Sequence, residues 1–519
     1  MTKIVLDALE RIDASPALRA QWVHVRRWLR DTECYGTVPL RRARGAPIAR
    51  LSRDDLRKML DAGLVEPIAD SRVRGWVNVF TVDEYTKRRR RPIKEPVDVN
   101  AVLGKETLIK QHMASKHEIA GLVQRGDFFI SLDFAAYFDQ FEYAPDVRRR
   151  FCFKNRDGKC YSLRALAMGQ RQAVEVANTA TKILLDFEGK RSTTTSIIDN
   201  VIFVGSREDV LHDAAIFVQR VAAVGGQLNE DTSDLESLVR QGDDWGGVAI
   251  NTATKTVALT TKVIAKLETS WARRACWTWR NFAAHVGLLF WSWGILDVPV
   301  CDFFPLLRFI SWLGARFTDS DPDCVPKWES AASVWPSAWP ALERWTAIAL
   351  QNSPRRVHAP ALTPAWLVCT DASGWGWGYV ALNPTTGEVR QHGEAWRPHF
   401  RQRFEQQLGH STFTEPQGVI NSLCHLLRKT GARQRIIVGT DSTVTQAAYT
   451  RGFNSHSFFI NDCAARLRRC FGDDDFSFEF HHVDGERNPA DPWSRQLRPH
   501  SDEHVGEYLR RELGNRPPS

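Results

Sequence analysis

The sequence predicts a protein of several domains, in which an α+β part is followed by an α/β part. Three observations lead to this prediction. The chain has 519 residues, too many for one hydrophobic core, so two to four domains are expected. Short apolar runs alternate with segments of helical periodicity over residues 101–270, and the alternation returns over residues 365–497. With 43% hydrophobic and 25% charged residues, the composition is that of an ordinary globular protein.

Residues 1–50 are predicted to form a basic N-terminal extension. They contain the runs RRWLR and RRARG, and TKIVLDALERI has apolar residues at helical spacing. Such a helix more often docks on another surface than anchors a protein in a membrane. The whole chain has a net charge of +8 and a pI near 9.0. This charge suits a polyanionic partner, although mildly basic proteins without such a ligand are also common.

Two apolar runs, Phe128–Phe141 and Thr195–Gly205, carry acids where a hydrophobic core needs none. Asp133 follows FFISL, and Asp199 and Asn200 lie between two isoleucines and VIF. A hairpin with an acid at its tip, facing an acid on a neighbouring strand, can hold divalent cations. Two such ions about 3.5–4 Å apart clamp the attacking and leaving oxygens of a phosphoryl transfer. Alternatively, Asp133 is a strand-end acid that only accepts backbone hydrogen bonds.

In their order, these motifs resemble the fingers and palm of a reverse transcriptase over residues 51–267. Asp133 and the following Phe138-Asp resemble the first metal motif, in which the aromatic ring screens the 2′ position of the incoming nucleotide. The stretch that ends in Asp199-Asn200 is similar to the second metal motif, with asparagine in place of its second aspartate. The resemblance implies that Asp133 and Asp199 are metal ligands and that Asn200 belongs to the catalytic site. Asn200 implies slower or Mn²⁺-favouring catalysis, or a site that is becoming inactive.

The resemblance also implies substrate-binding residues. LAMG, which ends at Gly169, is similar to the template-gripping motif, with alanine where proline is usual, and Gln170 follows it. The basic run KRRRR is similar to the fingers strand that meets the triphosphate, and Lys87 and Arg91 are the cations we expect to point inward. Phe138 completes this set as the steric gate. The alternatives are a solvated charge run for the cations and core packing for Phe138.

A second resemblance, to ribonuclease H, lies downstream in the segments VCTDASGWGWGYV, TEPQGV, IIVGTDS and NPADPWSR. Its catalytic and metal-binding carboxylates would be Asp371, Glu415, Asp441 and Asp491. Two Mg²⁺ ions relieve the mutual repulsion of such a set and activate water against an RNA phosphate.

Smaller features of this region have two interpretations each. Ser373 and Ser442 follow catalytic acids, and they either bind sugar or phosphate or serve as turn hydroxyls. Glu486 stands near the position of the family's catalytic-loop histidine. His481 and His482 are expected to cap the strand FSFEF.

Together, the matches resemble the reverse transcriptase and ribonuclease H region of a retroelement polyprotein, most closely of the tyrosine-recombinase (DIRS- and VIPER-like) or pararetroviral branch. The implied fold class is an α+β right-hand polymerase with fingers, palm and thumb, followed by an α/β ribonuclease H-like domain. The implied domains are fingers and palm at 51–267, a tryptophan-rich thumb or connection at 268–355, the ribonuclease H-like domain at 356–497 and a C-terminal tail at 498–519. We expect the GNRPPS end of that tail to be disordered.

The implied function is RNA- and DNA-templated DNA synthesis with degradation of the RNA in RNA–DNA hybrids. Its cofactor is Mg²⁺ or Mn²⁺, with two ions in each active site, and its partners are an RNA template, a DNA primer, the hybrid and dNTPs. One alternative is a domesticated or decayed polymerase that binds nucleic acid, with or without residual ribonuclease H activity. Another is an active ribonuclease H whose palm only holds the duplex.

Residues 268–355 hold a cluster of tryptophans that either packs a helical domain or stacks on bases. The cluster comprises Trp271, Trp277, Trp279, Trp291, Trp293, Trp312, Trp328, Trp335, Trp339 and Trp345. Packing is the simpler interpretation.

The remaining sequence features indicate an intracellular protein that is not secreted. The ten cysteines include no CxxC pair, which argues against a zinc site, and the N-terminus has no signal-like character. The most apolar stretch, His285–Val300, has about 14 uncharged residues, too few to span a bilayer. We therefore expect cytoplasmic or nuclear location and no membrane partner.

Overall fold

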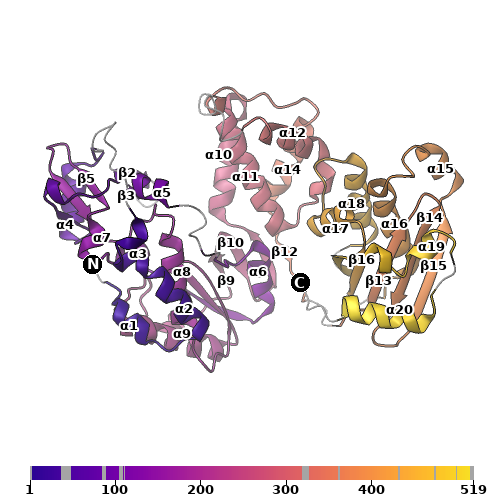
Figure 1. The fold of residues 1–519 in the computed structure, drawn as a ribbon, viewed down its shortest axis with the longest axis horizontal. Helices are drawn as coiled ribbons and strands as arrows, with labels where there is room; N and C mark the ends of the chain where they lie inside the picture. Colours follow the sequence, from indigo (N-terminus) through magenta and orange to yellow (C-terminus); the bar gives the residue numbers. More distant parts are fainter. Residues whose placement is uncertain are drawn as a thin grey trace. The chain divides into compact units, whose positions relative to one another are not determined.

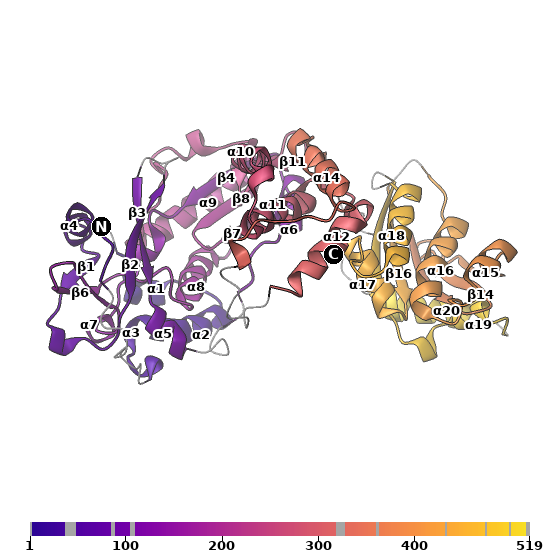
Figure 2. The same ribbon diagram turned by 90° about the horizontal axis from the view of Figure 1, so that it is seen from above.

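The computed structural model describes residues 3–36, 48–84, 89–103, 109, 111–317, 327–359, 363–430, 433–472, 475–497 and 500–514. The chain divides into two compact units, Met1–Thr256 and Val257–Ser519. Figures 1 and 2 show the first unit in indigo to magenta and the second in the colours that follow, up to yellow. No helix in the described part of the chain has the length and apolar character needed to cross a bilayer.

A three-stranded antiparallel sheet forms the centre of the first unit, with the strand order β4-β8-β7. Its strands are β4 (Phe128–Asp133), β7 (Thr193–Ile197) and β8 (Asn200–Gly205). Only Ile198 and Asp199 separate β7 from β8, and Ile198 has φ 57°, as a tight two-residue hairpin requires. The register places Asp133 opposite Asn200. The helices α8 (Ala173–Leu185) and α9 (Arg207–Ala223) pack against this sheet.

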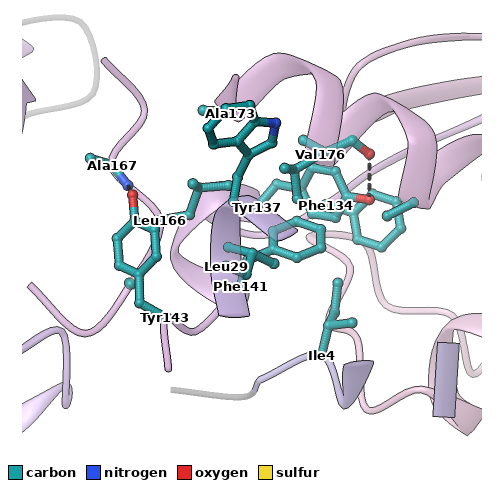
Figure 3. Close-up of a cluster of buried hydrophobic side chains, with 14 of the residues drawn as sticks. Ile4, Leu29, Phe134, Tyr137, Phe141, Tyr143, Leu166, Ala167, Ala173 and Val176 are labelled. Carbon is teal, nitrogen blue, oxygen red and sulfur yellow. Dashed lines mark hydrogen bonds between the residues drawn. The ribbon is translucent and has the colours of Figure 1, made fainter. Parts of the chain in front are cut away.

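The N-terminal residues belong to the same core and do not form a separate extension. Their helices are α1 (Leu6–Arg11), α2 (Pro16–Val25) and α3 (Arg27–Arg30), followed by the 3₁₀ turn η1 (Glu33–Tyr35). Figure 3 shows Ile4 and Leu29 beside Phe134 and Phe141, which follow β4. These helices join the core because they have apolar faces, on which Trp22 and other large side chains are buried. Residues 37–47, which complete the predicted extension, lie outside the described residues.

The smaller elements of the first unit form two further sheets, a hairpin and short helices. β2 (Asn78–Glu84) pairs with β3 (Arg89–Glu95), so the described part of the basic run, residues 89–91, lies in a strand, as the resemblance implies. β1 (Val65–Pro67), β6 (Cys160–Leu163) and β5 (Cys152–Lys154) form a three-stranded sheet, and β9 (Gly242–Trp245) pairs with β10 (Val248–Asn251). The short helices are α4 (Arg53–Asp61), α5 (Val97–Val102), α6 (Lys116–Gly121) and α7 (Pro145–Arg148).

The second unit begins with a helical region in which aromatic residues pack together. The helices are α10 (Thr261–Ala272), α11 (Trp279–Leu296), α12 (Phe304–Gly314) and α14 (Trp339–Gln351), with β11 (Thr256–Leu259) beside β12 (Arg355–Arg356). Trp277 and Trp345 are 4% and 0% exposed, which confirms the packing interpretation for these two residues. His285 is also buried, between the hydroxyls of Ser270 and Thr346, and burial lowers its pKa to about 4.

A five-stranded sheet with the order β15-β14-β13-β16-β17 forms the rest of the second unit, which we call the C-terminal domain. β13 (Trp366–Ala372), β14 (Gly376–Leu382) and β15 (Val389–Ala395) are antiparallel neighbours, whereas β16 (Gln434–Thr440) and β17 (Phe476–His482) run parallel to β13. The helices are α15 (Pro398–Phe404), α16 (Ser411–Leu426), α17 (Thr443–Arg451), α18 (Phe458–Cys470), α19 (Asp491–Ser494) and α20 (Asp502–Leu509).

Helices cover both faces of this sheet, so β13 and β14 are buried along their whole length. Val368 packs in one core with residues of α16 and α18, and its neighbours Leu367 and Cys369 pack in the other core with α20. This alternation is the two-residue period of a strand. The predicted C-terminal tail therefore contains a packed helix, because Val505 and Leu509 are buried in that second core. Residues 515–519 lie outside the described part.

Candidate functional site

Three carboxylates meet at one end of the C-terminal sheet. Asp371 lies in β13, Glu415 in the first turns of α16, and Asp441 directly after β16. Each offers a carboxylate oxygen within 4.8 Å of those of the other two. Because β13 and β16 are adjacent and parallel, their carboxyl ends lie at the same edge of the sheet. We call these three residues the carboxylate cluster.

Asp371 and Glu415 are buried and Asp441 is half-buried, and the pKa of each acid is raised. Burial, followed by the charges of Asp441 and Asp491, raises the pKa of Asp371 to about 6, and the hydrogen bond from Ser494 opposes this rise. Burial and the charges of Asp371 and Asp441 raise the pKa of Glu415 well above its usual value. Burial likewise raises the pKa of Asp441. Bringing these groups together as anions is costly without a positive charge between them.

The two oxygens of Glu415 have different surroundings. Oε1 accepts a hydrogen bond of 3.0 Å from the backbone N–H of Ala372. Oε2 is buried and has no hydrogen-bond partner among the described residues. Mg²⁺ binds carboxylate oxygens in proteins. Burying a carboxylate oxygen costs free energy unless a hydrogen-bond donor or a cation contacts it. The carboxylate cluster therefore fits a divalent cation.

Asp491, the fourth predicted carboxylate, lies close by but outside the cluster. It begins α19, and its Oδ1 accepts a hydrogen bond of 2.6 Å from Arg495 Nε. Its charge still contributes to the raised pKa of Asp371 and of Asp441. The structure thus brings three of the four predicted acids together and pairs the fourth with an arginine.

Ser494 is a residue of this site that the sequence analysis did not single out. Its Oγ donates a hydrogen bond to Asp371 Oδ2, and its carbonyl accepts one of 2.6 Å from Ser373 Oγ. The signal was its position three residues after Asp491, in the same short helix. Ser373 and Ser442 have the alternative role of turn and cap hydroxyls, since Ser442 Oγ accepts the N–H of Thr445.

The predicted histidines end β17 beside the carboxylate cluster. His482 Nε2 lies 3.1 Å from the carbonyl oxygen of Asp441, and the His482 charge acts to lower the pKa of Asp441. Glu486 lies in the following 3₁₀ turn, where its N–H donates to Asp484 Oδ1. The pairing of His482 with the Asp441 backbone agrees with a role in capping the strand end.

In the first unit, a cavity of about 490 Å³ lies at the tip of the β7–β8 hairpin. We call it the hairpin cavity. Four of the predicted site residues line it: Arg91, Asp133, Phe138 and Asp199. Its other described lining residues are Arg90, Pro92, Lys94, Phe134, Ala136, Tyr137, Asp139, Met168 and Asn229. Lys87 lies outside the described residues.

Three acids line the hairpin cavity, and two of them, Asp133 and Asp199, are the predicted metal ligands. The backbone N–H of Phe134 donates a 3.1 Å hydrogen bond to the carbonyl of Asp199, which ties the strand end to the hairpin tip. Burial raises the pKa of Asp199, and the charge of Arg91 opposes this rise. Asn229 Nδ2 donates a 2.9 Å hydrogen bond to Asp133 Oδ2. Sequence analysis missed Asn229, since the loop before it has no motif that points to a site.

The amide oxygen of Asn200 is hydrogen-bonded to a buried side chain of β9. Its Oδ1 accepts a 2.5 Å hydrogen bond from the indole N–H of Trp245, which is 1% exposed in β9. Asn200 is absent from the described residues that line the hairpin cavity. The oxygen that would ligate a metal is thus engaged by a buried indole.

Gly169 and Gln170 hold the loop that leads into α8. A Cβ on Gly169 would lie 2.6 Å from the carbonyl oxygen of Lys94, so only glycine permits this close approach to β3. Gln170 is 2% exposed, accepts a 2.5 Å hydrogen bond from Tyr143 Oη and donates one of 3.2 Å to Tyr35 Oη. The structure therefore directs Gln170 into the core and away from the hairpin cavity.

Similarity to known proteins is limited to solved structures of low sequence identity. No protein-family model matches the sequence, and no curated protein does. Among solved structures, the chain is similar to a foamy viral protease-reverse transcriptase in complex with dsDNA, with a TM-score of 0.47, 12% identity, and coverage of 92% of this chain and 96% of that one. It is also similar to one in complex with an RNA/DNA hybrid, with a TM-score of 0.46, 13% identity, and coverage of 92% and 62%.

Proposed function

We propose that the chain is a reverse transcriptase of retrotransposon origin. In this proposal, the C-terminal domain cleaves the RNA strand of RNA–DNA hybrids, and the first unit synthesises DNA on RNA or DNA templates. One observation carries the nuclease half. Three acids from β13, α16 and the end of β16, two of them buried and Asp441 half-buried, present oxygens within 4.8 Å of one another, and Glu415 Oε2 has no partner among the described residues. The order of the sequence motifs supports the polymerase half.

Asp371, Glu415 and Asp441 would hold Mg²⁺ or Mn²⁺, and Asp491 is near enough to influence the charge of the site. When bound, such ions would supply the positive charge that activates a water molecule and stabilises the charge developing on the RNA phosphate. The chain's own groups prepare the ligands. Ser494 orients the Asp371 carboxylate through its hydroxyl, and the backbone N–H of Ala372 orients Glu415.

The raised pKa values have a chemical consequence for this site. Asp371, with a pKa of about 6, and Glu415, with a pKa well above its usual value, hold their protons to a higher pH than ordinary carboxyl groups do when no cation is present. Ligation requires the carboxylate form, so cation binding must release these protons. Affinity for the cation should therefore rise with pH across the range in which Asp371 loses its proton, around pH 6.

For synthesis, we propose that Asp133 and Asp199 hold the ions that activate the primer 3′-hydroxyl and neutralise the pyrophosphate. Arg91 lies beside Asp199 in the hairpin cavity and would meet the phosphates of the dNTP. Phe138 lines the same cavity and would exclude a 2′-hydroxyl. Lys94 is 5% exposed and forms an ion pair with Asp139, which holds β3 to the turn that carries Phe138.

A second candidate is a first unit that binds nucleic acid and does not synthesise DNA. The hydrogen bond from Trp245 to Asn200 favours it, because that bond occupies the oxygen which a polymerase would direct to a metal. In this case the C-terminal domain would be the active enzyme, and the first unit would hold the duplex.

Paired assays on the full chain test the proposal. Primer extension on poly(A)–oligo(dT) with Mg²⁺ or Mn²⁺ is measured beside cleavage of an RNA–DNA hybrid. Asp133→Ala should abolish extension and leave cleavage intact, and Asp441→Asn should do the reverse. Glu405→Gln, an exposed acid-to-amide change, is the matched control. Extension by the Asp133 variant at the wild-type rate would refute its metal role, and cleavage without extension by the wild type would support the second candidate.

A further inference from the structure

One groove of the C-terminal domain has no role in the chemistry proposed above. It is a groove of about 1040 Å³ lined by residues of α15, α16 and α18 and of the strand ends beside them. We call it the arginine groove. Its described lining residues include none of the four predicted carboxylates. In both views of the fold, α16 lies between α15 and α18 (Figures 1 and 2).

One face of α16 forms the floor of the arginine groove. Phe413, Gln417, Asn421 and Cys424, together with Arg428 just after the helix, line it at intervals of three or four residues. This is the spacing of a single helix face. Glu415 lies on the same helix but points into the carboxylate cluster. At 1.5 Å per residue, the stripe from Phe413 to Arg428 is about 22 Å long.

Positive charge predominates along this groove. Among its described lining residues, four are arginines and two are acids. One of those acids, Asp462, is already paired with Arg466, whose Nε lies 3.1 Å from its carboxylate. Arg397, Arg403 and Arg428 are exposed. The groove therefore suits a ligand with several negative charges.

Aromatic rings form the wall of the same groove in a nearly parallel series. Trp396 and Phe400 have centroids 5.0 Å apart at 29°, Phe400 and Phe413 lie 5.8 Å apart at 29°, and Phe413 and Phe459 lie 3.9 Å apart at 24°. The neighbouring Phe458 is 67% exposed, which is costly for so large an apolar side chain. The rings of this series stack on one another, while the exposed Phe458 and the half-buried Phe400 offer aromatic surface on which bases of single-stranded nucleic acid can stack.

We propose that the arginine groove binds single-stranded nucleic acid. Its bases would stack on Phe458 and the half-buried Phe400, and its phosphates would pair with Arg397, Arg403 and Arg428. Gln417, on the floor, is already engaged by Asn421 and Arg466, so the amides give the groove a fixed shape. An acidic peptide would satisfy the arginines but would not use the series of rings. The proposal concerns binding and does not require either proposed active site to be active.

Photocrosslinking of the full chain tests this proposal independently of other nucleic-acid sites. A single-stranded RNA oligonucleotide that carries 4-thiouridine is crosslinked to the Asp441→Asn protein, and the crosslinked peptides are identified. We expect crosslinks in residues 396–404 or 458–459. In the double variant Phe458→Ala, Arg403→Ala the yield of these crosslinks should fall about tenfold, because one stacking ring and one phosphate partner are removed. Arg487→Ala, which removes an arginine that is 76% exposed, is the matched control and should lose nothing.

Two results would overturn the proposal. One is crosslinking only outside the groove, with the double variant equal to the control. The other is displacement of a groove-bound probe by poly-glutamate but not by oligo(dT), which would indicate an acidic peptide ligand. Cleavage of an RNA–DNA hybrid by the same groove variants with Asp441 restored shows separately that they fold and whether the proposed nuclease is active.

Discussion

Asparagine in place of Asp371 should stabilise the metal-free C-terminal domain at neutral pH. Asp371 is 3% exposed, and its pKa is raised from 3.8 to about 6. Between these values the folded state binds more protons than the unfolded state, so the stability of the wild type falls as pH rises through this window and stays low above it. The difference of about 2 pKa units corresponds to about 3 kcal/mol. Asp371→Asn carries no such penalty, and its amide oxygen can still accept the Ser494 hydroxyl.

Native-state hydrogen exchange measures this effect locally, which matters because a chain of two units does not unfold in one step. The amides of Leu367–Cys369 in β13 should be more strongly protected in the variant at pH 8 with EDTA, and the advantage should disappear near pH 4. Mg²⁺ should stabilise the wild type and leave the variant unchanged. Asp484→Asn, at an acid that is 59% exposed, is the control. A variant less stable than the wild type at pH 8 in EDTA would refute the reasoning.

Three further substitutions have defined outcomes. Ser494→Ala should weaken Mg²⁺ binding about 10–100-fold, measured by calorimetric titration, because Asp371 loses its orienting donor. Ser494→Thr should restore the binding. Unchanged binding in Ser494→Ala would contradict the orienting role. Gly169→Ala should cost about 1–3 kcal/mol in the unfolding of the first unit, because its Cβ meets the carbonyl oxygen of Lys94 at 2.6 Å; unchanged stability would show that the loop moves freely. Asn200→Asp should raise Mg²⁺-dependent primer extension about tenfold if the first unit is active. An equal or lower rate in a folded variant would argue that the site is adapted to asparagine.

Strands and acids were predictable from the sequence where local pattern decides the structure. FFISL and IIVGT are mainly apolar runs, and they lie in β4 and β16, with the predicted acids at the end of β4 and directly after β16. The two-residue tip at Ile198 and Asp199 follows from the short spacing between two apolar runs. In such places, period and turn length alone determine which side chains share an edge.

Contacts between distant segments could not be predicted in this way. The hydrogen bond from Trp245 to Asn200 and that from Asn229 to Asp133 join residues with no shared motif. The burial of Trp22 in the core depends on a partner surface that the sequence does not reveal, and so the basic N-terminus was predicted to be an extension. Gln170 follows a motif glycine, yet two tyrosines direct it inward. Tertiary packing determines these positions, and the local sequence pattern does not reveal which distant segments pack together.

The central claim is tested most directly by comparing the wild type with Glu415→Gln. The measurement is the rate at which the full chain cleaves the RNA strand of a labelled RNA–DNA hybrid in Mg²⁺. Glutamine keeps the shape of the side chain and the acceptor for the Ala372 N–H, so the fold should be preserved. It replaces the unpartnered carboxylate oxygen with a neutral amide. We predict cleavage by the wild type with 3′-hydroxyl and 5′-phosphate ends, and a loss of at least about 100-fold in the variant. Equal cleavage by both proteins, or none by the wild type with either Mg²⁺ or Mn²⁺, would contradict the assignment of the carboxylate cluster.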